Sequence, residues 1–348
     1  MPDEIRLAVD VMGGDHGPKT IIPACINYLN TNFDVSITMV GDVKQIKKVL
    51  REIVSKKSNK FCFDLSGNSE RLNIFHTDKE ISMNDAPSFA LKNGKESSMW
   101  KAIEITKEGK TDAVVSAGNT GALMAIARFL LRTLPGIDRP AIASALPNKK
   151  GISTTVLDLG ANIECSPSQL FQFASMGSAL VSVNDLIPNP TIGLLNIGEE
   201  NIKGNEVVKE TSKLLESSNL NFVGNVEGDD IFNGSVNVVV CDGFVGNIVL
   251  KSSEGLAQMI INLLKEEYKS NSLSKLAAFI SSPVLKKFGS KIDHRRYNGA
   301  ALVGLRGVVY KSHGSADSFG FEHAIERAVG SVRNGLNVKI IEALNQNN

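Results

Sequence analysis

Residues 5–16 read IRLAVDVMGGDH. Its first half is a short run of β-branched and other apolar residues, the pattern of a buried β-strand. The run stops at Gly13 and Gly14, and two glycines followed by Asp15 and His16 are typical of a tight loop after a strand. The stretch therefore predicts a strand that leads through a glycine loop toward a helix.

Short strands and longer amphipathic helices continue to alternate along the chain. Strands are predicted at 5–11, 35–40, 113–116, 154–157, 191–197, 236–241 and 308–310. Helical apolar periodicity covers 119–134 and 204–216. This alternation is typical of crossover units on a parallel sheet. We therefore expect residues 1–348 to form a single α/β domain with a mostly parallel open sheet flanked by helices.

Composition and charge narrow the class of protein. The 348 residues carry 38 Lys and Arg against 37 Asp and Glu, a net charge of +1, whereas general nucleic-acid binders usually carry a large basic excess. No apolar run approaches the ~18 residues of a membrane span, and the acidic start is unlike a secretory signal. The cysteines, Cys25, Cys62, Cys165 and Cys241, show no disulfide or CxxC spacing. We therefore expect a cytoplasmic protein with reduced thiols that binds no nucleic acid.

One segment departs from the alternation, because two long helical patterns follow each other from 253 to 289 without a strand between them. Residues 251–296 hold nine Lys and Arg against four Asp and Glu, a net charge of +5, so the rest of the chain carries −4. We expect a helical hairpin at 253–291 that leaves the α/β body. Its apolar stripe and lysines suit a membrane surface, a second subunit or an acidic partner, or else the stripe packs into the core.

Six predicted strands end in loops made of glycine with Asp, Asn, Ser or His. These loops are 10–16, 116–121, 160–162, 198–205, 242–247 and 313–317. The carboxyl ends of parallel strands share one edge of an open sheet, where glycines admit a ligand and helix N-termini favour an anion. The sequence therefore predicts one shared site for a phosphate-like ligand, although a lone glycine after a strand usually serves only the turn.

Several side chains in these loops can handle an anion. Lys203 precedes a predicted helix, where its ammonium can join helix-end amides, or it is a solvated lysine. His16 and His313 can exchange protons near neutral pH or merely cap their loops. Lys251, one turn after Asn247, reaches the same edge or begins the basic segment. Because metal-ligand spacing, nucleotide-binding glycine motifs and a GxSxG elbow are absent from the sequence, we expect chemistry without a metal or cofactor.

Six motifs in or near these loops resemble the bacterial phosphate acyltransferase family, PlsX. They are AVDVMGGDHGP at 8–18, SAGNTGAL at 116–123, GIDRP at 136–140, KGNE at 203–206, DGFVGN at 242–247 and HGS at 313–315. The resemblance runs in order over nearly the whole chain, and the first motif is long enough to be specific by itself. It implies that inorganic phosphate attacks the thioester of a fatty acyl chain on acyl carrier protein, which yields acyl phosphate for phospholipid synthesis.

The resemblance also implies an isocitrate/isopropylmalate dehydrogenase-like fold, a homodimer, peripheral membrane contact and a downstream glycerol-phosphate acyltransferase. The catalytic residues it predicts are Lys203, His16, Asn119 and His313. The predicted substrate-binding residues are Asp10, Gly13, Gly14, Asp15, Gly118, Thr120, Gly121, Asn162, Gly198, Gly204, Asn205, Asp242, Gly243, Gly246 and Asn247. The chain departs from the family pattern at Phe319-Gly320, where a more polar residue is expected.

A site for this reaction must strip water from phosphate, neutralise its charge and aim one oxygen at the thioester carbonyl. Glycine-loop amides and Lys203 suit the first two tasks, and Asn side chains or backbone amides suit the oxyanion that forms. Because a thiolate leaves readily, we expect direct transfer without an acyl-enzyme. The nearest rival is a phosphotransacetylase-like enzyme that uses acyl-CoA. A nicotinamide-dependent dehydrogenase and a non-catalytic phosphate- or carrier-binding regulator are more distant.

Overall fold

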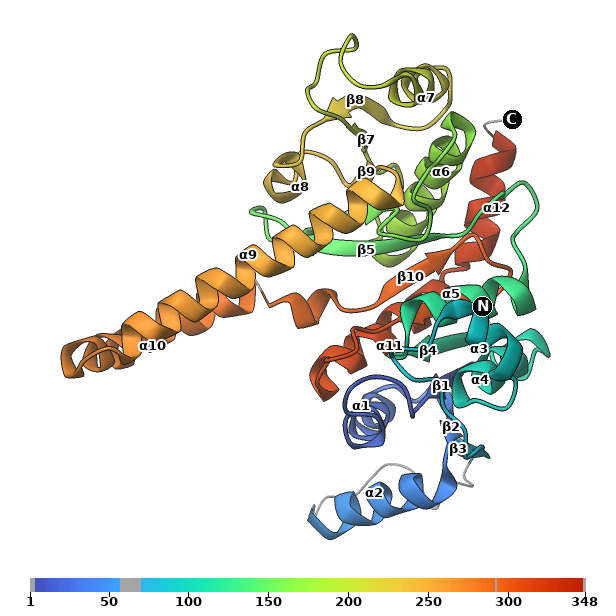
Figure 1. Ribbon diagram of the computed structural model, residues 1–348, viewed down its shortest axis with the longest axis vertical. Coiled ribbons are helices and arrows are strands. Elements are labelled where there is room, and N and C mark those ends of the chain that lie inside the picture. The colour runs from blue at the N-terminus through green and yellow to red at the C-terminus, as the bar shows by residue number, and fades with distance from the viewer. Residues whose placement is uncertain (1–3, 57–69, 292, 347–348) are drawn as a thin grey trace.

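Eleven strands join in one sheet in the computed structural model, which describes residues 4–56, 70–291 and 293–346 (Figure 1). Their order across the sheet is β3-β2-β1-β4-β11-β10-β5-β6-β9-β7-β8. The strands are β1 (Ile5–Asp10), β2 (Val35–Gly41), β3 (Leu72–His76), β4 (Ala113–Ser116), β5 (Ala141–Pro147), β6 (Ser153–Leu157), β7 (Ile192–Leu195), β8 (Phe222–Val226), β9 (Val238–Val240), β10 (Ala300–Val303) and β11 (Val308–Lys311).

Helices cover both faces of this sheet, as expected for an α/β fold (Figure 1). They are α1 (Pro18–Thr31), α2 (Val43–Lys56), α3 (Pro87–Asn93), α4 (Ser98–Lys107), α5 (Thr120–Leu131), α6 (Pro167–Asn184), α7 (Glu206–Glu216), α8 (Asp230–Asn233), α9 (Gly243–Lys269), α10 (Ser272–Lys291), α11 (Ser318–Arg333) and α12 (Leu336–Gln346), with a 3-10 turn η1 (His294–Tyr297).

Every strand predicted from periodicity is present, and β4 matches its predicted range residue for residue. The periodicity misses four strands, β3, β5, β8 and β10. Two of these, β5 and β10, read AIASALP and AALV. Because alanine is depleted in strands, neither segment carries a strand pattern.

The two halves of the sheet run in opposite directions. β3, β2, β1, β4 and β11 are mutually parallel, and so are β6, β9, β7 and β8. Between these halves, β10 is antiparallel to both β11 and β5, and β5 is antiparallel to β6. The prediction that all six glycine loops share one edge is therefore wrong, because the unpredicted strands β5 and β10 reverse the direction of the chain.

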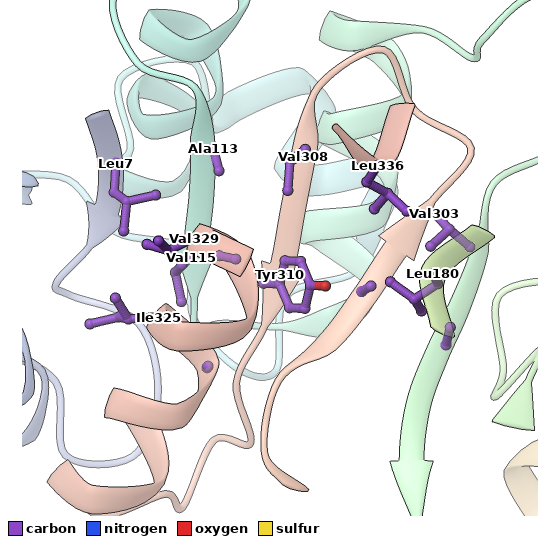
Figure 2. Close-up of a cluster of buried hydrophobic side chains, with 14 of the residues drawn as sticks. Leu7, Ala113, Val115, Leu180, Val303, Val308, Tyr310, Ile325, Val329 and Leu336 are labelled. Atoms are coloured by element: carbon purple, nitrogen blue, oxygen red, sulfur yellow. The ribbon is translucent and has the colours of Figure 1, made fainter. Parts of the chain in front are cut away.

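The largest apolar cluster lies under the centre of the sheet, where Figure 2 shows Tyr310 of β11 between Val115 and Leu180. Tyr310 is 1% exposed. Its hydroxyl oxygen lies 2.9 Å from Nδ2 of Asn184 on α6 and 2.7 Å from Oγ of Ser331 on α11. One buried hydroxyl thus ties two helices to the middle of the sheet.

Helices α9 and α10 form a hairpin that projects from the body (Figure 1). Its first helix starts at Gly243, earlier than the helical pattern predicts. Apolar side chains along both helices are exposed, including Leu263, Phe279 and Ile280, so they do not pack into the core. In the described part of the chain, no helix is both long and apolar enough to span a bilayer.

Three of the four cysteines lie in the described ranges, and all three are free thiols. Cys25 and Cys241 are buried, and Cys165 is half-buried. Cys62 and residues 1–3, which include Asp3 of the acidic start, lie outside the described residues.

We expect Tyr310→Phe to lower the free energy of unfolding by about 1–3 kcal/mol, because Asn184 and Ser331 each lose a buried hydrogen-bond partner. Urea denaturation followed by circular dichroism measures the loss. Tyr268→Phe is the matched control, since that hydroxyl has only a 3.4 Å contact with Ser281 within the hairpin. Equal losses in both variants would contradict the anchoring role of Tyr310.

Candidate functional site

Three residues that end neighbouring strands lie side by side. Asp10 ends β1, Ser116 ends β4 and Lys311 ends β11, and the register pairs Asp10 with Ser116 and Ser116 with Lys311. Because paired residues of neighbouring strands point to the same face, the three form one row, here called the polar row. Each is at most 8% exposed. The polar row therefore holds a carboxyl group and an ammonium group inside the protein.

The carboxyl group of Asp10 is bonded to both neighbouring loops. Oγ of Ser116 donates to Oδ2 of Asp10 at 2.7 Å, and the backbone N–H of Met12 donates to Oδ1 at 3.3 Å. The backbone N–H of Gly118 donates in turn to Oγ of Ser116 at 3.0 Å. Burial raises the pKa of Asp10, and hydrogen bonds from Ser98 and Ser116 oppose this effect. These bonds fix how the chain leaves β1 and β4.

Lys311 is not among the residues that the motifs predict. Its Nζ donates to the backbone carbonyl oxygen of Ala117 at 3.2 Å and to that of Ser312. Since Ala117 follows β4 and Ser312 follows β11, the ammonium joins the starts of two loops. The sequence does contain a local indication of this residue, because a lysine that ends the otherwise apolar run VVYK of a buried strand is unusual.

Burial and three charged side chains set the pKa of Lys311. Burial lowers the pKa of Lys311 to about 8, and the positive charge of Lys251 adds to the decrease. The carboxylates of Asp10 and Asp15 act in the opposite direction. A lysine of this kind changes its charge near the pH at which many enzymes work, and such perturbed groups are typical of functional sites.

Three glycine loops pack on one another above the polar row. A Cβ on Gly13 would lie 2.6 Å from the backbone nitrogen of Gly118, and one on Gly14, whose φ is +83°, would lie 2.9 Å from the carbonyl oxygen of Gly314. The backbone N–H of Asp15 donates to that same oxygen at 2.9 Å. The loops after β1, β4 and β11 thereby carry ten of the predicted site residues: Asp10, Gly13, Gly14, Asp15, His16, Gly118, Asn119, Thr120, Gly121 and His313.

Among these ten, the side chain of Asn119 is already engaged. Its Oδ1 accepts from the backbone N–H of Ala122 at 3.0 Å and so caps α5, while Nδ2 donates to the carbonyl oxygens of Met83 and Asp85. His16 and His313 are exposed. Nδ1 of His313 accepts from the backbone N–H of Ser315 at 3.3 Å and lies 2.9 Å from Oγ of Ser315. The geometry thus favours Asn119 as the residue that starts α5, and it leaves both imidazole rings accessible to solvent.

A second cluster forms at the opposite edge, around the fully buried Asp158 that follows β6. Its carboxylate accepts from three backbone N–H groups at 2.6–3.1 Å and from Nδ2 of Asn162 at 2.9 Å. A Cβ on Gly243 would lie 2.8 Å from the same carboxylate. The predicted residues Asn162 and Gly243 therefore lie against a carboxylate that the loop motifs do not contain, and a Cβ on Gly246 would overlap the backbone carbonyl oxygen of the same residue. The side chain of Asn247 packs beside Gly160 of the same loop.

Lys203 lies apart from the polar row. Its loop follows β7, five places from β11, a separation of ~24 Å at about 4.8 Å per strand. Nζ of Lys203 forms a 2.7 Å ion pair with Glu200 and packs over Gly198. A cavity of about 610 Å³ against β8 is lined by other residues of this loop and by no member of the polar row. The structure does not bring Lys203 together with the two predicted catalytic histidines.

The remaining predicted residues shape helix starts. Oδ1 of Asn205 accepts from the backbone N–H of Val208 at 2.9 Å and caps α7. Oδ1 of Asp242 accepts from the backbone N–H of Val245 at 2.8 Å and caps α9. Gly204, before α7, has a φ of +90°, a conformation that glycine adopts readily. Within the described ranges, no three His, Cys, Asp or Glu side chains gather as metal ligands would.

Helix α9 connects the two clusters, because it starts beside Asp158 and runs back over the sheet. Ala300 of β10 is in register with Lys311 and packs against the same apolar cluster as Val249 and Leu250 of α9. Lys251 on the next position of α9 therefore comes near Lys311, close enough for its charge to help lower the pKa of Lys311. A lysine on the helix that begins in the second half of the sheet thus adds positive charge near the polar row of the first.

Comparison with known proteins agrees with this architecture. Residues 5–339 match the model of a family described as fatty acid synthesis protein. A phosphate acyltransferase of Polynucleobacter asymbioticus is 53% identical over 339 residues, 97% of either chain. Two solved structures are similar at low sequence identity. A phosphotransacetylase from Streptococcus pyogenes is 14% identical, with a TM-score of 0.63, and the match covers 96% of this chain and 95% of that one. A 4-hydroxythreonine-4-phosphate dehydrogenase from Klebsiella pneumoniae is 15% identical, with a TM-score of 0.51, and the match covers 95% of this chain and 98% of that one. The two structural likenesses show the fold alone, and they agree with the α/β, dehydrogenase-like fold expected from the sequence.

We expect Gly246→Ala to destabilise the protein and Gly255→Ala to stabilise it, although both glycines lie in α9. A Cβ at 246 would overlap the carbonyl oxygen of Asp158, and such overpacking costs ~1–3 kcal/mol or more. A Cβ at 255 meets nothing within 4 Å, so alanine there gains about 0.5–1 kcal/mol of helix propensity. Urea denaturation of the two variants measures both shifts. A stabilising shift at 246 would contradict the close packing of α9 on the Asp158 loop.

Proposed function

The chain belongs to the fatty acid synthesis protein family of bacterial phosphate acyltransferases, and from that premise we propose that it transfers a fatty acyl group from acyl carrier protein to inorganic phosphate. The observation that carries this proposal is the polar row with three glycine loops packed above it. Closely packed loop amides, the N-terminus of α5 and a buried ammonium suit a small, highly charged oxyanion. The product, acyl phosphate, then serves phospholipid synthesis through a glycerol-phosphate acyltransferase.

The proposed reaction is a direct displacement. An oxygen of HPO4²⁻ attacks the thioester carbonyl carbon, a C–O bond forms, the C–S bond breaks, and the phosphate proton ends on the departing thiolate. The loop amides and Lys311 neutralise phosphate charge, and backbone N–H groups of the loops stabilise the oxyanion on the carbonyl oxygen. In this proposal the imidazoles of His16 and His313 relay the proton, which their exposure to solvent supports. The catalytic role of Lys203 stays a prediction.

The described cysteines are poor candidates for an acyl-enzyme nucleophile. Burial raises the pKa of Cys165 to about 11, and it raises the pKa of Cys25 and Cys241 as well. Since the thiolate is the reactive form, these thiols are nearly unreactive at neutral pH. This supports direct transfer from carrier to phosphate.

A second candidate function uses acyl-CoA in place of acyl carrier protein, as in phosphotransacetylases. The likeness of fold to the Streptococcus pyogenes phosphotransacetylase favours it. The two candidates share the attack by phosphate and differ only in the thiol that leaves.

We also propose that the hairpin of α9 and α10 is the contact surface of the enzyme. Its exposed apolar side chains suit a second subunit of a homodimer or a lipid surface, and its exposed Lys286 and Lys287 suit an anionic lipid or the acidic carrier. Peripheral contact would deliver acyl phosphate where the next acyltransferase uses it. Residues 251–296 carry a net charge of +5, which supports an anionic partner.

Incubation with long-chain acyl carrier protein and phosphate, followed by trapping with hydroxylamine, tests the function. We expect hydroxamate that requires phosphate, with no stable acyl adduct on any cysteine or serine during turnover. Much faster reaction with acyl-CoA would favour the second candidate. No product from either thioester would contradict the function and leave a phosphate- or carrier-binding protein.

Charge reversal of the hairpin, Lys286→Glu with Lys287→Glu, tests the contact surface. We expect weaker binding to vesicles that contain anionic lipid or to acyl carrier protein, because each reversed lysine replaces attraction with repulsion. Lys47→Glu with Lys48→Glu is the matched control, an adjacent exposed pair on α2. Unchanged affinity for both partners would refute this use of the hairpin.

A further inference from the structure

We propose that Lys311 and Lys251 together hold the phosphate oxyanion, on the face of the sheet that α5 and α9 cover. The proposed function supplies only the identity of the ligand, phosphate. The positions of the two lysines follow from the fold. Neither residue belongs to the loop motifs that predict the site. Lys311 comes from the first half of the sheet, and Lys251 comes from the helix that starts in the second half.

The register of the strands places both helices over Lys311. The residues two positions before the polar row belong to the apolar cluster that α5 covers; they are Ala8, Val114 and Val309. On the other side of Lys311, Ala300 packs against the cluster that also holds the first turns of α9. Since alternate residues of a strand share a face, α5 and α9 cover the face on which the side chain of Lys311 lies.

The ammonium group of Lys311 has a donor to spare. An ammonium has three N–H donors, and two of them go to the carbonyl oxygens of Ala117 and Ser312. No residue in the described part of the chain accepts the third. Both acceptors are neutral, and the described ranges contain no ion pair of Lys311, although the carboxylates of Asp10 and Asp15 favour its charged form. One N–H of the ammonium is therefore left for an anion.

Lys251 supplies a second cation that can turn toward the same anion. Its Nζ is paired with Glu254 at 2.8 Å, but the two side chains are 59% and 41% exposed. Exposed pairs of this kind contribute little to stability, so the ammonium can exchange Glu254 for a stronger partner. Two ammonium groups that approach each other repel, and an oxyanion between them turns repulsion into attraction. The N-terminus of α5, which starts at Thr120, adds partial positive charge at the same edge.

Proton uptake is a consequence of this arrangement. Burial and Lys251 lower the pKa of Lys311 to about 8, while Asp10 at the end of β1 and Asp15 in the following loop oppose them. A bound anion favours the charged ammonium and raises that pKa again. Above about pH 8, phosphate binding must therefore bring a proton to Lys311, and the affinity for phosphate must fall as the pH rises further.

Calorimetric titration of the full-length protein with inorganic phosphate, without any acyl substrate, tests the site. We expect Lys251→Met to weaken phosphate binding roughly tenfold, as the loss of one charge-assisted contact implies. Lys311→Met weakens binding at least as much and abolishes proton uptake above about pH 8, measured by comparing buffers of different ionisation enthalpy. Lys339→Met is the control, because Lys339 forms the same kind of i,i+3 pair with Glu342 at 3.0 Å on α12. Its phosphate affinity should equal that of the unchanged protein.

The outcomes separate this site from the proposed function. Acyl phosphate formation combined with unchanged phosphate affinity in Lys251→Met overturns the site and leaves the function standing. Lysine-dependent phosphate binding without acyl phosphate formation supports the site and overturns the function. Absence of any phosphate binding by the unchanged protein also overturns the site. If Lys311→Met fails to fold, Lys251→Met and the proton uptake of the unchanged protein decide.

Discussion

The burial of opposite charges in the polar row is the constraint on which the site depends. Taking a carboxyl group and an ammonium group out of water costs several kcal/mol per ion unless each is bonded to partners inside the protein. Asp10 finds them in Ser116 and in backbone N–H groups, and Lys311 finds them in two carbonyl oxygens. Because those partners lie at the starts of three loops, satisfying the buried groups also fixes the loops. Tight glycine contacts then follow, since no side chain fits where the loops cross.

Because the two halves of the sheet run in opposite directions, α9 connects the loops at one edge of the sheet with the polar row at the other. If all strands were parallel, the loops after β6 and β9 would lie at the same edge as the polar row, and no connecting element would be needed. With β5 and β10 inserted, those loops lie at the opposite edge, and α9 brings a lysine back across the sheet. The same helix continues into the projecting hairpin, so a single element extends from the polar row to the exposed apolar surface (Figure 1).

Much of the fold could be predicted from the sequence, because buried parallel strands such as β4 are apolar runs followed by glycine. The alanine-rich strands β5 and β10 could not be predicted, and without them the sequence does not show that half of the sheet runs in the opposite direction. The loop motifs put His16, Asn119 and His313 in or beside three loops that pack on one another, because these loops follow adjacent strands. They cannot separate Lys203 from this group, since that distance depends on strand order. The loop motifs contain neither Lys311 nor Asp158, because the first ends a strand and the second directly follows one. A lysine at the end of the apolar run VVYK is a local signal for Lys311, whereas the burial of Asp158 depends on how distant segments pack.

A crystal structure of the enzyme with bound phosphate would show whether Lys311 and Lys251 hold the anion. We expect phosphate oxygens within about 2.7–2.9 Å of Nζ of Lys311 and Nζ of Lys251, the distance of charge-assisted hydrogen bonds, with Lys251 released from Glu254. Phosphate bound instead at the Lys203 loop, with the contacts of Lys311 and Lys251 unchanged, would contradict this role of the two lysines.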